Sequence, residues 1–196
     1  MDKAERTREY IIETASRIFN KKGYDGTSFS DIIESTGLSK GAIYGHFENK
    51  DELALAALDY NLELASRIIF SNVKDRPDSY EKLIGFAKSY SQFYEIINKA
   101  GGCPVINAAV DSDDGHDEVR KRVIKTIAIW QNSIKKIISE GIKNGELKSS
   151  PEVEVFSDIF ISLIEGAIML SKVMNDRRYI DNASNYLVSL VEKMRV

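Results

Sequence analysis

The sequence predicts an all-α fold of about nine helices. Apolar residues recur at spacings of three and four along most of the 196 residues, which is typical of helices with one buried face. Alternation of the kind that predicts strands is almost absent, and the chain has three prolines and no low-complexity run. We therefore expect a helical protein that is long enough to bury a substantial core.

The first helix is expected over residues 4–22. Its apolar stripe includes Tyr10, Ile11 and Phe19 at helical spacing, and Gly23 ends it. Arg8 lies near its start, where the side chain could reach a DNA phosphate or simply face solvent.

Residues 27–50 predict two short helices joined by a tight turn. Thr27 or Ser28 can cap the first, because a hydroxyl there accepts a hydrogen bond from an unpaired backbone N–H. Asp31 stands where a capping-box acid reaches back to the cap. Gly37 suits the left-handed conformation that commonly ends a helix.

Ser39 is placed to cap the second short helix, which we expect to run to about Phe47. Two helices joined by a short turn containing glycine form a helix-turn-helix, whose second helix enters the DNA major groove. The spacing alone therefore indicates DNA binding, although short capped helices occur in many folds.

Asn49 or Asp51 begins the fourth helix. It is predicted over residues 50–71, and five further helices are predicted over residues 78–99, 104–112, 116–143, 152–174 and 177–194. We expect two domains: residues 1–49 would bind DNA, and residues 50–196 would bind a ligand and form a dimer.

Composition excludes several classes of protein. The formal net charge is −3, and basic and acidic residues balance within residues 1–50, so DNA binding would depend on a few well-placed basic groups. One cysteine and two histidines predict no internal disulfide and no zinc site. We find no signal peptide and no membrane-spanning run, and expect a cytoplasmic protein without a cofactor.

Residues 111–118 are strongly acidic and superficially resemble a calcium loop. The glycine, Gly115, stands at the wrong offset and no glutamate occupies the closing position. An acidic first turn of the next helix explains the segment better.

Several motifs together resemble the TetR family of bacterial transcriptional repressors, specifically over about the first quarter of the chain. The remaining three quarters resemble the family in pattern only. The residues that carry the resemblance are Arg8, Ile11, Ile12, Ala15, Phe19, Gly23-Tyr24, Thr27-Ser28, the run Gly37-Leu38-Ser39-Lys40-Gly41, Tyr44, His46-Phe47 and Lys50.

The resemblance implies a DNA-binding surface on the second short helix. The phosphate backbone would be held by Thr27, Tyr44, His46 and Lys50, while Lys40 and Ala42 would lie near bases. The candidate DNA-binding residues are Thr27, Ser28, Ser39, Lys40, Gly41, Ala42, Tyr44, His46 and Lys50. Gly45 departs from the family, which usually has a bulkier side chain there, and so removes one possible contact.

For the C-terminal part, the resemblance implies a cavity for a small, apolar or aromatic effector inside a helical bundle. The candidate ligand-binding residues are Tyr60, Phe86, Tyr90, Phe93, Cys103, Asn107, Trp130, Gln131, Glu165 and Met169. An aromatic stripe at helical spacing is more commonly plain core.

Cys103 precedes Pro104, so its thiol would lie at a helix N-terminus, where the dipole favours the thiolate. A Gly-Cys-Pro turn resembles a subset of the family that includes thiol-based sensors of oxidants and electrophiles. The alternative is that Cys103 is a small buried hydrophobe.

The last two helices carry broad apolar surface, and the resemblance implies a two-fold dimer built as a four-helix bundle. The candidate dimerisation residues are Phe156, Phe160, Leu163, Ala167, Tyr186, Leu187 and Leu190. A dimer would place two recognition helices about 34–36 Å apart, as a palindromic operator requires.

The sequence is best explained as a homodimeric repressor that a small-molecule inducer releases from operator DNA. One alternative is a redox or electrophile sensor acting through Cys103. Another is a carrier or enzyme that does not bind DNA, but no nucleophile–base pair, metal set or phosphate loop supports enzymatic activity.

Overall fold

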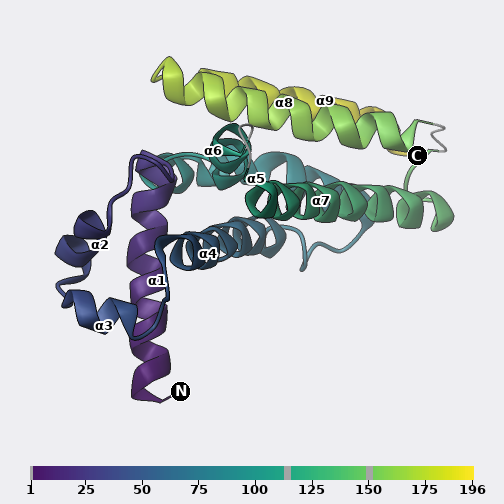
Figure 1. The fold of residues 1–196 in the computed structure, drawn as a ribbon. Coiled ribbons are helices and arrows are strands. Elements are labelled where there is room, and N and C mark those ends of the chain that lie inside the picture. The colour runs from purple at the N-terminus through teal and green to yellow at the C-terminus, as the bar shows by residue number, and fades with distance from the viewer. Residues whose placement is uncertain (1, 113–115, 149–151) are drawn as a thin grey trace. The chain divides into compact units, whose positions relative to one another are not determined.

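The computed structural model describes residues 2–112, 116–148 and 152–196 (Figure 1). Within these residues the chain forms nine α-helices and one isolated bridge between Leu147 and Arg195. The helices are α1 (Lys3–Lys22), α2 (Phe29–Thr36), α3 (Lys40–Tyr44), α4 (Lys50–Ser71), α5 (Ser79–Lys99), α6 (Pro104–Asp111), α7 (Asp117–Lys143), α8 (Val153–Val173) and α9 (Arg178–Met194). The all-α prediction is confirmed.

Eight of these helices begin and end within one residue of the predicted bounds; side-chain caps start α1 and α2, whereas α6, α8 and α9 begin without one. The exception is α3, which stops at Tyr44 rather than near Phe47. Beyond Gly45 the chain tightens into a turn, since the His46 N–H bonds the Ile43 carbonyl at 3.0 Å. Asp113, Asp114, Gly115 and Pro151, which entered the predicted acidic turn and chain break, lie outside the described residues.

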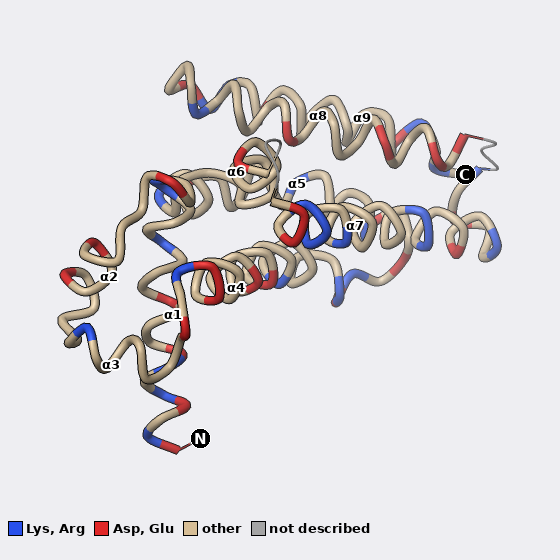
Figure 2. Tube along the Cα trace, in the orientation of Figure 1, with Lys and Arg blue, Asp and Glu red and all other residues tan. Residues whose placement is uncertain are grey.

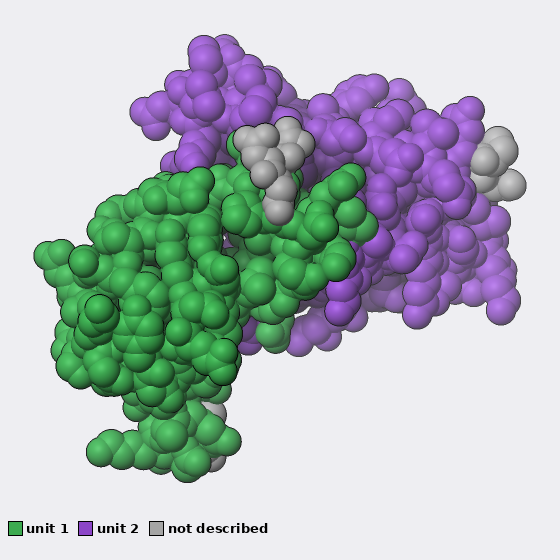
Figure 3. All heavy atoms as spheres, in the orientation of Figure 1, with its two compact units in different colours: residues 1–64, 100–124 green, residues 65–99, 125–196 purple. Residues whose placement is uncertain are grey.

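The chain divides into two compact units, shown in green and purple in Figure 3. Unit 1 comprises residues 1–64 and 100–124, and unit 2 comprises residues 65–99 and 125–196. The helix-turn-helix therefore shares a compact unit with the start of α4, with α6 and with the start of α7. The functional division at residues 49 and 50 stays a prediction.

Unit 1 is built around the inner faces of α1, α2, α3 and α4. Its core consists of Ile11, Ile12, Ala15, Ile32, Ile43, Phe47, Leu53 and Ala57, each 9% exposed or less. Asparagine side chains connect its segments: the Asn61 amide donates to the Ser16 carbonyl at 2.9 Å, and the Asn20 amide donates to the Ala100 carbonyl at 2.7 Å. These bonds join residues far apart in sequence to α1.

Unit 2 is held by the packing of α9 against α5 and α8, and the ribbons of α8 and α9 run side by side in Figure 1. Phe86 lies at its centre, with edge-on contacts to Phe70 and Phe160 at 5.9 and 5.6 Å between ring centroids. The fully buried Trp130 donates its indole N–H to the Ser66 hydroxyl at 3.0 Å. Aromatic side chains therefore lie within a core whose other buried residues are mainly aliphatic.

No helix among the described residues is both long and apolar enough to cross a membrane. The same residues bring together no group of three or more histidine, cysteine, aspartate or glutamate side chains that could hold a metal ion.

Candidate nucleic-acid interface

The start of α2 is fixed by a reciprocal pair of hydrogen bonds between Ser28 and Asp31. The Ser28 hydroxyl accepts from the Asp31 N–H at 3.1 Å, and the Asp31 carboxylate accepts from the Ser28 N–H at 2.8 Å. Ser28 is thus the N-cap, and Thr27 is not. The Lys22 ammonium lies 2.6 Å from the other Asp31 oxygen, and it is the main reason that the pKa of Asp31 lies well below its ordinary range, followed by the bonds from Ser28.

The turn between α2 and α3 is held from two sides. Gly37 has a φ of 67°, in the left-handed region, and its N–H bonds the Ile33 carbonyl at 3.0 Å. The buried Thr36 hydroxyl donates to the Ile32 carbonyl at 2.8 Å and accepts from the Leu38 N–H at 3.3 Å. Tyr10 donates its phenolic O–H to the Thr36 carbonyl at 3.1 Å, so α1 fixes the end of α2.

Sequence reasoning missed this role of Tyr10, which had been placed in the buried stripe of the first helix. Its side chain is 47% exposed, and only the hydroxyl reaches back into the fold. A threonine directly before the capping glycine was a visible signal for the turn. The tyrosine gave no such signal, because its partner is 26 residues away.

The short helix α3 presents one face to solvent and one to the core. Ser39 caps it by accepting the Ala42 N–H at 3.2 Å, and Ile43 is fully buried. On the outer face Tyr44 stacks on Phe29 with ring centroids 4.9 Å apart and planes 7° from parallel. The Lys40 ammonium lies 5.6 Å from the centre of the Tyr44 ring, so a cation is exposed at the start of the helix.

Basic and acidic residues balance over residues 1–50, which we call the head, as the sequence indicates. Figure 2 shows acidic positions on α2 and a single basic position on α3. Two further cations are supported by aromatic rings: the Arg8 guanidinium lies 4.8 Å from the Phe47 ring centre, and the Lys50 ammonium lies 4.1 Å from the Tyr24 ring centre. Such contacts hold a long basic side chain in place while leaving its charge available to a phosphate.

Most of the predicted DNA-binding residues lie on the surface of unit 1. Exposed are Ser28, Ser39, Lys40, Gly41 and Tyr44, and partly exposed are Ala42, His46 and Lys50. Thr27 differs, because it is 1% exposed and its hydroxyl donates to the Gly23 carbonyl at 2.7 Å. In this structure Thr27 fixes the loop before α2, and its contact with phosphate stays a prediction.

The comparisons with known proteins agree with this geometry. Residues 11–57 match the family described as "Bacterial regulatory proteins, tetR family", and residues 79–187 match "Tetracyclin repressor-like, C-terminal domain". A TetR-family regulator from Cytophaga hutchinsonii has a solved structure that is 35% identical, with a TM-score of 0.92, over 100% of this chain and 98% of that one. This chain belongs to the TetR family.

Other TetR-family relatives are similar along nearly the whole chain. A regulator from Chloroflexus aurantiacus is 33% identical with a TM-score of 0.94, over 100% of this chain and 98% of its own. The transcriptional repressor DhaR of Mycobacterium sp. strain GP1 is 25% identical over 89% of this chain and 86% of its own. The protein is therefore a DNA-binding transcriptional regulator, from a family whose members are generally not enzymes.

The predicted ligand-binding residues of this TetR-family protein belong to both compact units: Tyr60, Cys103 and Asn107 to unit 1, and the others to unit 2. Phe86, Tyr90 and Trp130 are buried in unit 2, where the Tyr90 and Trp130 rings meet at 6.4 Å. Six others are distributed as follows: Tyr60, Phe93, Gln131 and Glu165 are partly buried, Met169 is 47% exposed, and Asn107 lines a cavity in unit 1. Gln131 donates to the Asp158 carboxylate at 2.7 Å.

Cys103 is 4% exposed at the N-cap of α6, with Pro104 as the first helical residue. Its placement before a helix agrees with the sequence prediction. Its burial favours the alternative in which the side chain fills space in the core.

The predicted dimerisation residues are divided between the inside and the outside of unit 2. Phe160, Ala167 and Leu187 are buried within the single chain, and Tyr186 is 55% exposed. Phe156, Leu163 and Leu190 are partly exposed. A different set of apolar side chains on α8 is 41–75% exposed: Val155, Ile159, Met169, Leu170 and Val173.

Proposed function

We propose that this TetR-family regulator is a homodimeric repressor that binds a palindromic operator and releases it when a small molecule binds. The observation that carries the proposal is α3, which is capped, anchored by Ile43 and exposed along Ser39, Lys40, Gly41 and Tyr44. Small residues at its start allow the backbone to approach the major groove closely. Such a regulator would act in the bacterial cytoplasm, where its DNA is.

Repression, rather than activation, is supported by the description of one relative. DhaR is described as a transcriptional repressor, and a head bound at an operator would hinder transcription by occupying the DNA. The exposed apolar side chains on α8 support a dimer, because a patch of this kind marks an interaction surface. The two heads of a dimer would read half-sites one helical turn apart.

Release by a small molecule would be a shift between two dimer states. An effector that binds more tightly to the state whose heads do not fit the operator lowers the affinity for DNA. The fourth helix would transmit the change, since it begins directly after the helix-turn-helix and its last residues, 65–71, belong to unit 2.

The test is operator binding by the purified protein, measured by fluorescence anisotropy with the DNA that flanks its gene. We expect sequence-selective binding that weakens as salt rises, because each phosphate contact releases a counterion. Tyr44→Ala and Lys40→Ala should each weaken binding by about tenfold or more, corresponding to the loss of one good contact.

Lys88→Ala is the matched control, since Lys88 is an exposed lysine on α5, outside the head. It should leave operator binding unchanged. Wild-type affinity in both head variants would show that α3 does not read DNA, and the proposal would fail.

A further inference from the structure

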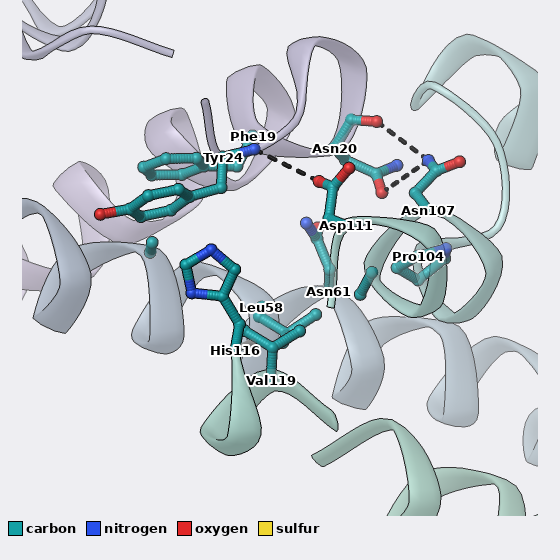
Figure 4. A pocket seen from close by; sticks show the side chains of 12 residues that line it. Phe19, Asn20, Tyr24, Leu58, Asn61, Pro104, Asn107, Asp111, His116 and Val119 are labelled. Carbon is teal, nitrogen blue, oxygen red and sulfur yellow. Dashed lines mark hydrogen bonds between the residues drawn. The ribbon is translucent and has the colours of Figure 1, made fainter. Parts of the chain in front are cut away.

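Unit 1 contains a cavity of about 60 Å³ between α1, the first half of α4, α6 and the start of α7 (Figure 4). None of the predicted ligand-binding residues except Asn107 lines it. The lining residues are Phe19, Asn20, Tyr24, Ala54, Leu58, Asn61, Pro104, Asn107, Ala108, Asp111, His116 and Val119. One water-sized group needs about 10–15 Å³, so this cavity can hold a ligand of only a few non-hydrogen atoms.

The asparagine side chains at this cavity already use their amide N–H groups in hydrogen bonds within the protein. The Asn107 amide donates to the backbone of Asn20 and of Gly101, at 2.9 and 3.1 Å, and also to the Asn20 side chain. The Asn61 amide donates to the Ser16 carbonyl, and the Asn20 amide donates to Ala100 and Gly102. With the amide donors engaged, the groups left for a ligand are the asparagine oxygens, the Asp111 carboxylate and the ring nitrogens of His116.

Among the described lining residues, Asp111 is the one carboxylate. It is exposed, and it accepts the Tyr24 backbone N–H at 3.3 Å through one oxygen, which leaves its second oxygen for a ligand. Figure 4 shows the Asp111 side chain directed toward the loop at Tyr24, and the His116 ring beneath the Tyr24 ring. The remaining wall is apolar, with Phe19, Leu58 and Val119.

From this combination we infer that the cavity is a binding site for a small primary amine with a short apolar tail. The ammonium group would donate to Asp111 and to the asparagine oxygens, and the tail would lie against Leu58 and Val119. An anion would face the Asp111 charge, and a neutral alcohol would lose the charge-assisted bond.

The site is connected to the DNA-binding surface through Tyr24. The ring of Tyr24 forms part of the cavity wall, and its hydroxyl donates to the Asp51 carboxylate in the first turn of α4. That bond, together with partial burial, raises the pKa of Tyr24 to about 12, so the phenol remains a donor. The Lys50 ammonium, a predicted phosphate contact, lies 4.1 Å from the centre of the same ring.

An occupant of the cavity therefore touches the side chain that positions Lys50 and Asp51. We expect amine binding to change the affinity for the operator, and operator binding to change the affinity for the amine by the same factor. This regulatory step depends on the proposed function, whereas amine binding itself does not.

The binding test uses isobutylamine with the full-length protein, measured by titration calorimetry. We expect a dissociation constant of about 1 mM or below. Isobutanol and isobutyrate have nearly the same shape and should bind at least about tenfold more weakly, since a hydrogen bond between charged partners is lost.

Two variants assign the binding to this cavity. Asp111→Asn keeps an acceptor for the Tyr24 N–H but removes the charge, and should weaken amine binding by about tenfold or more. Ala54→Leu fills the cavity from α4 and should abolish it. Asp25→Asn is the matched control, because Asp25 is an exposed carboxylate on the same loop as Tyr24 but does not line the cavity.

Absence of isobutylamine binding, or binding that neither variant weakens, would overturn the site. Equal binding of isobutanol would overturn the amine specificity. The regulatory step is tested by operator affinity with saturating isobutylamine in the wild type and in Tyr24→Phe, which keeps the ring but loses the bond to Asp51. An unchanged operator affinity in the wild type would overturn that step.

Operator binding without amine separates this inference from the proposed function. If the protein binds its operator but no amine, the amine site is wrong and the proposed function stands. If the protein binds the amine at Asp111 but no operator, the proposed function is wrong and the amine site stands.

Discussion

Two exposed glycines flank α3 and have opposite backbone conformations. Gly37 has a φ of 67°, and a Cβ built there meets no atom within 4 Å, so only the backbone conformation disfavours a side chain. Gly45 has a φ of −71° and a ψ of −14°, which is ordinary right-handed helix, and a Cβ there would lie 3.4 Å from the Gly41 carbonyl oxygen. The two positions therefore demand glycine to different degrees.

We predict that Gly37→Ala lowers the free energy of unfolding by about 1–2 kcal/mol, because an L-residue is strained in the left-handed region. Gly45→Ala should raise it by about 0.4–1 kcal/mol, since alanine restricts the unfolded chain and fits the native conformation. Urea unfolding followed by circular dichroism measures both values. Equal losses at the two positions would contradict the role given to backbone conformation.

At the scale of elements, the start of α2 depends on a carboxylate as well as on the packing of Phe29. Asp31 accepts bonds from Ser28 and pairs with Lys22, and these interactions lower its pKa below the ordinary value of 3.8. A lowered pKa in the folded state means that the ionised carboxylate stabilises the fold above the unfolded pKa. This stabilisation is lost as the pH falls through the folded pKa.

We therefore predict that Asp31→Asn destabilises the head at neutral pH and that its difference from the wild type shrinks as the pH falls below about 3.8. Urea unfolding at a series of pH values checks this. Asp25→Asn, in the preceding exposed loop, is the control and should show no such pH-dependent difference. A difference between Asp31→Asn and wild type that is the same at pH 7 as in acid would show that the charge of Asp31 is not the cause.

Helix positions were predictable from the sequence because the signals that end helices are local. Ser28 with Asp31, Ser39 and Gly37 each act within three or four residues of the helix end they define. The end of α3 was the weakest prediction, since Gly45 permits either continuation or a turn and carries no side chain to decide between them.

The cavity in unit 1 could not be predicted, because its walls come from segments around residues 19–24, 54–61, 104–111 and 116–119. No periodicity in the sequence shows that these segments meet. The inner and outer faces of α8 were equally difficult to separate, since apolar residues occur on both. Phe160 is fully buried there, while Ile159, its neighbour, is 50% exposed.

For the whole molecule, the exposed apolar side chains of α8 predict self-association. Glutamate at both Ile159 and Leu170 would place two charges on this face, and burying them in an interface is costly. We expect the wild type to sediment as a dimer and Ile159→Glu/Leu170→Glu as a monomer. The double variant should also bind the operator more weakly, because each head then binds one half-site alone.

Ile96→Glu is the matched control for the double variant, since Ile96 is 55% exposed on α5. It should leave the dimer intact. A wild type that is monomeric at micromolar concentration, or a double variant that remains dimeric, would show that α8 does not form the interface.

Unit 1, which contains the helix-turn-helix, also includes residues 100–124, and these are synthesised only after α4 and α5. Residues 100–124 belong to the same compact unit as residues 1–64, and Asn20 and Asn107 tie them to α1. The apolar core of unit 1 lies within the first four helices, whereas the contacts of residues 100–124 with α1 can form only after that later segment has been synthesised. A hybrid regulator assembled by exchanging only residues 1–49 would join a foreign head to a native 100–124 segment. The surfaces around Asn20, Tyr24 and Asp111 would have to be exchanged together for such a chimera to fold as its parents do.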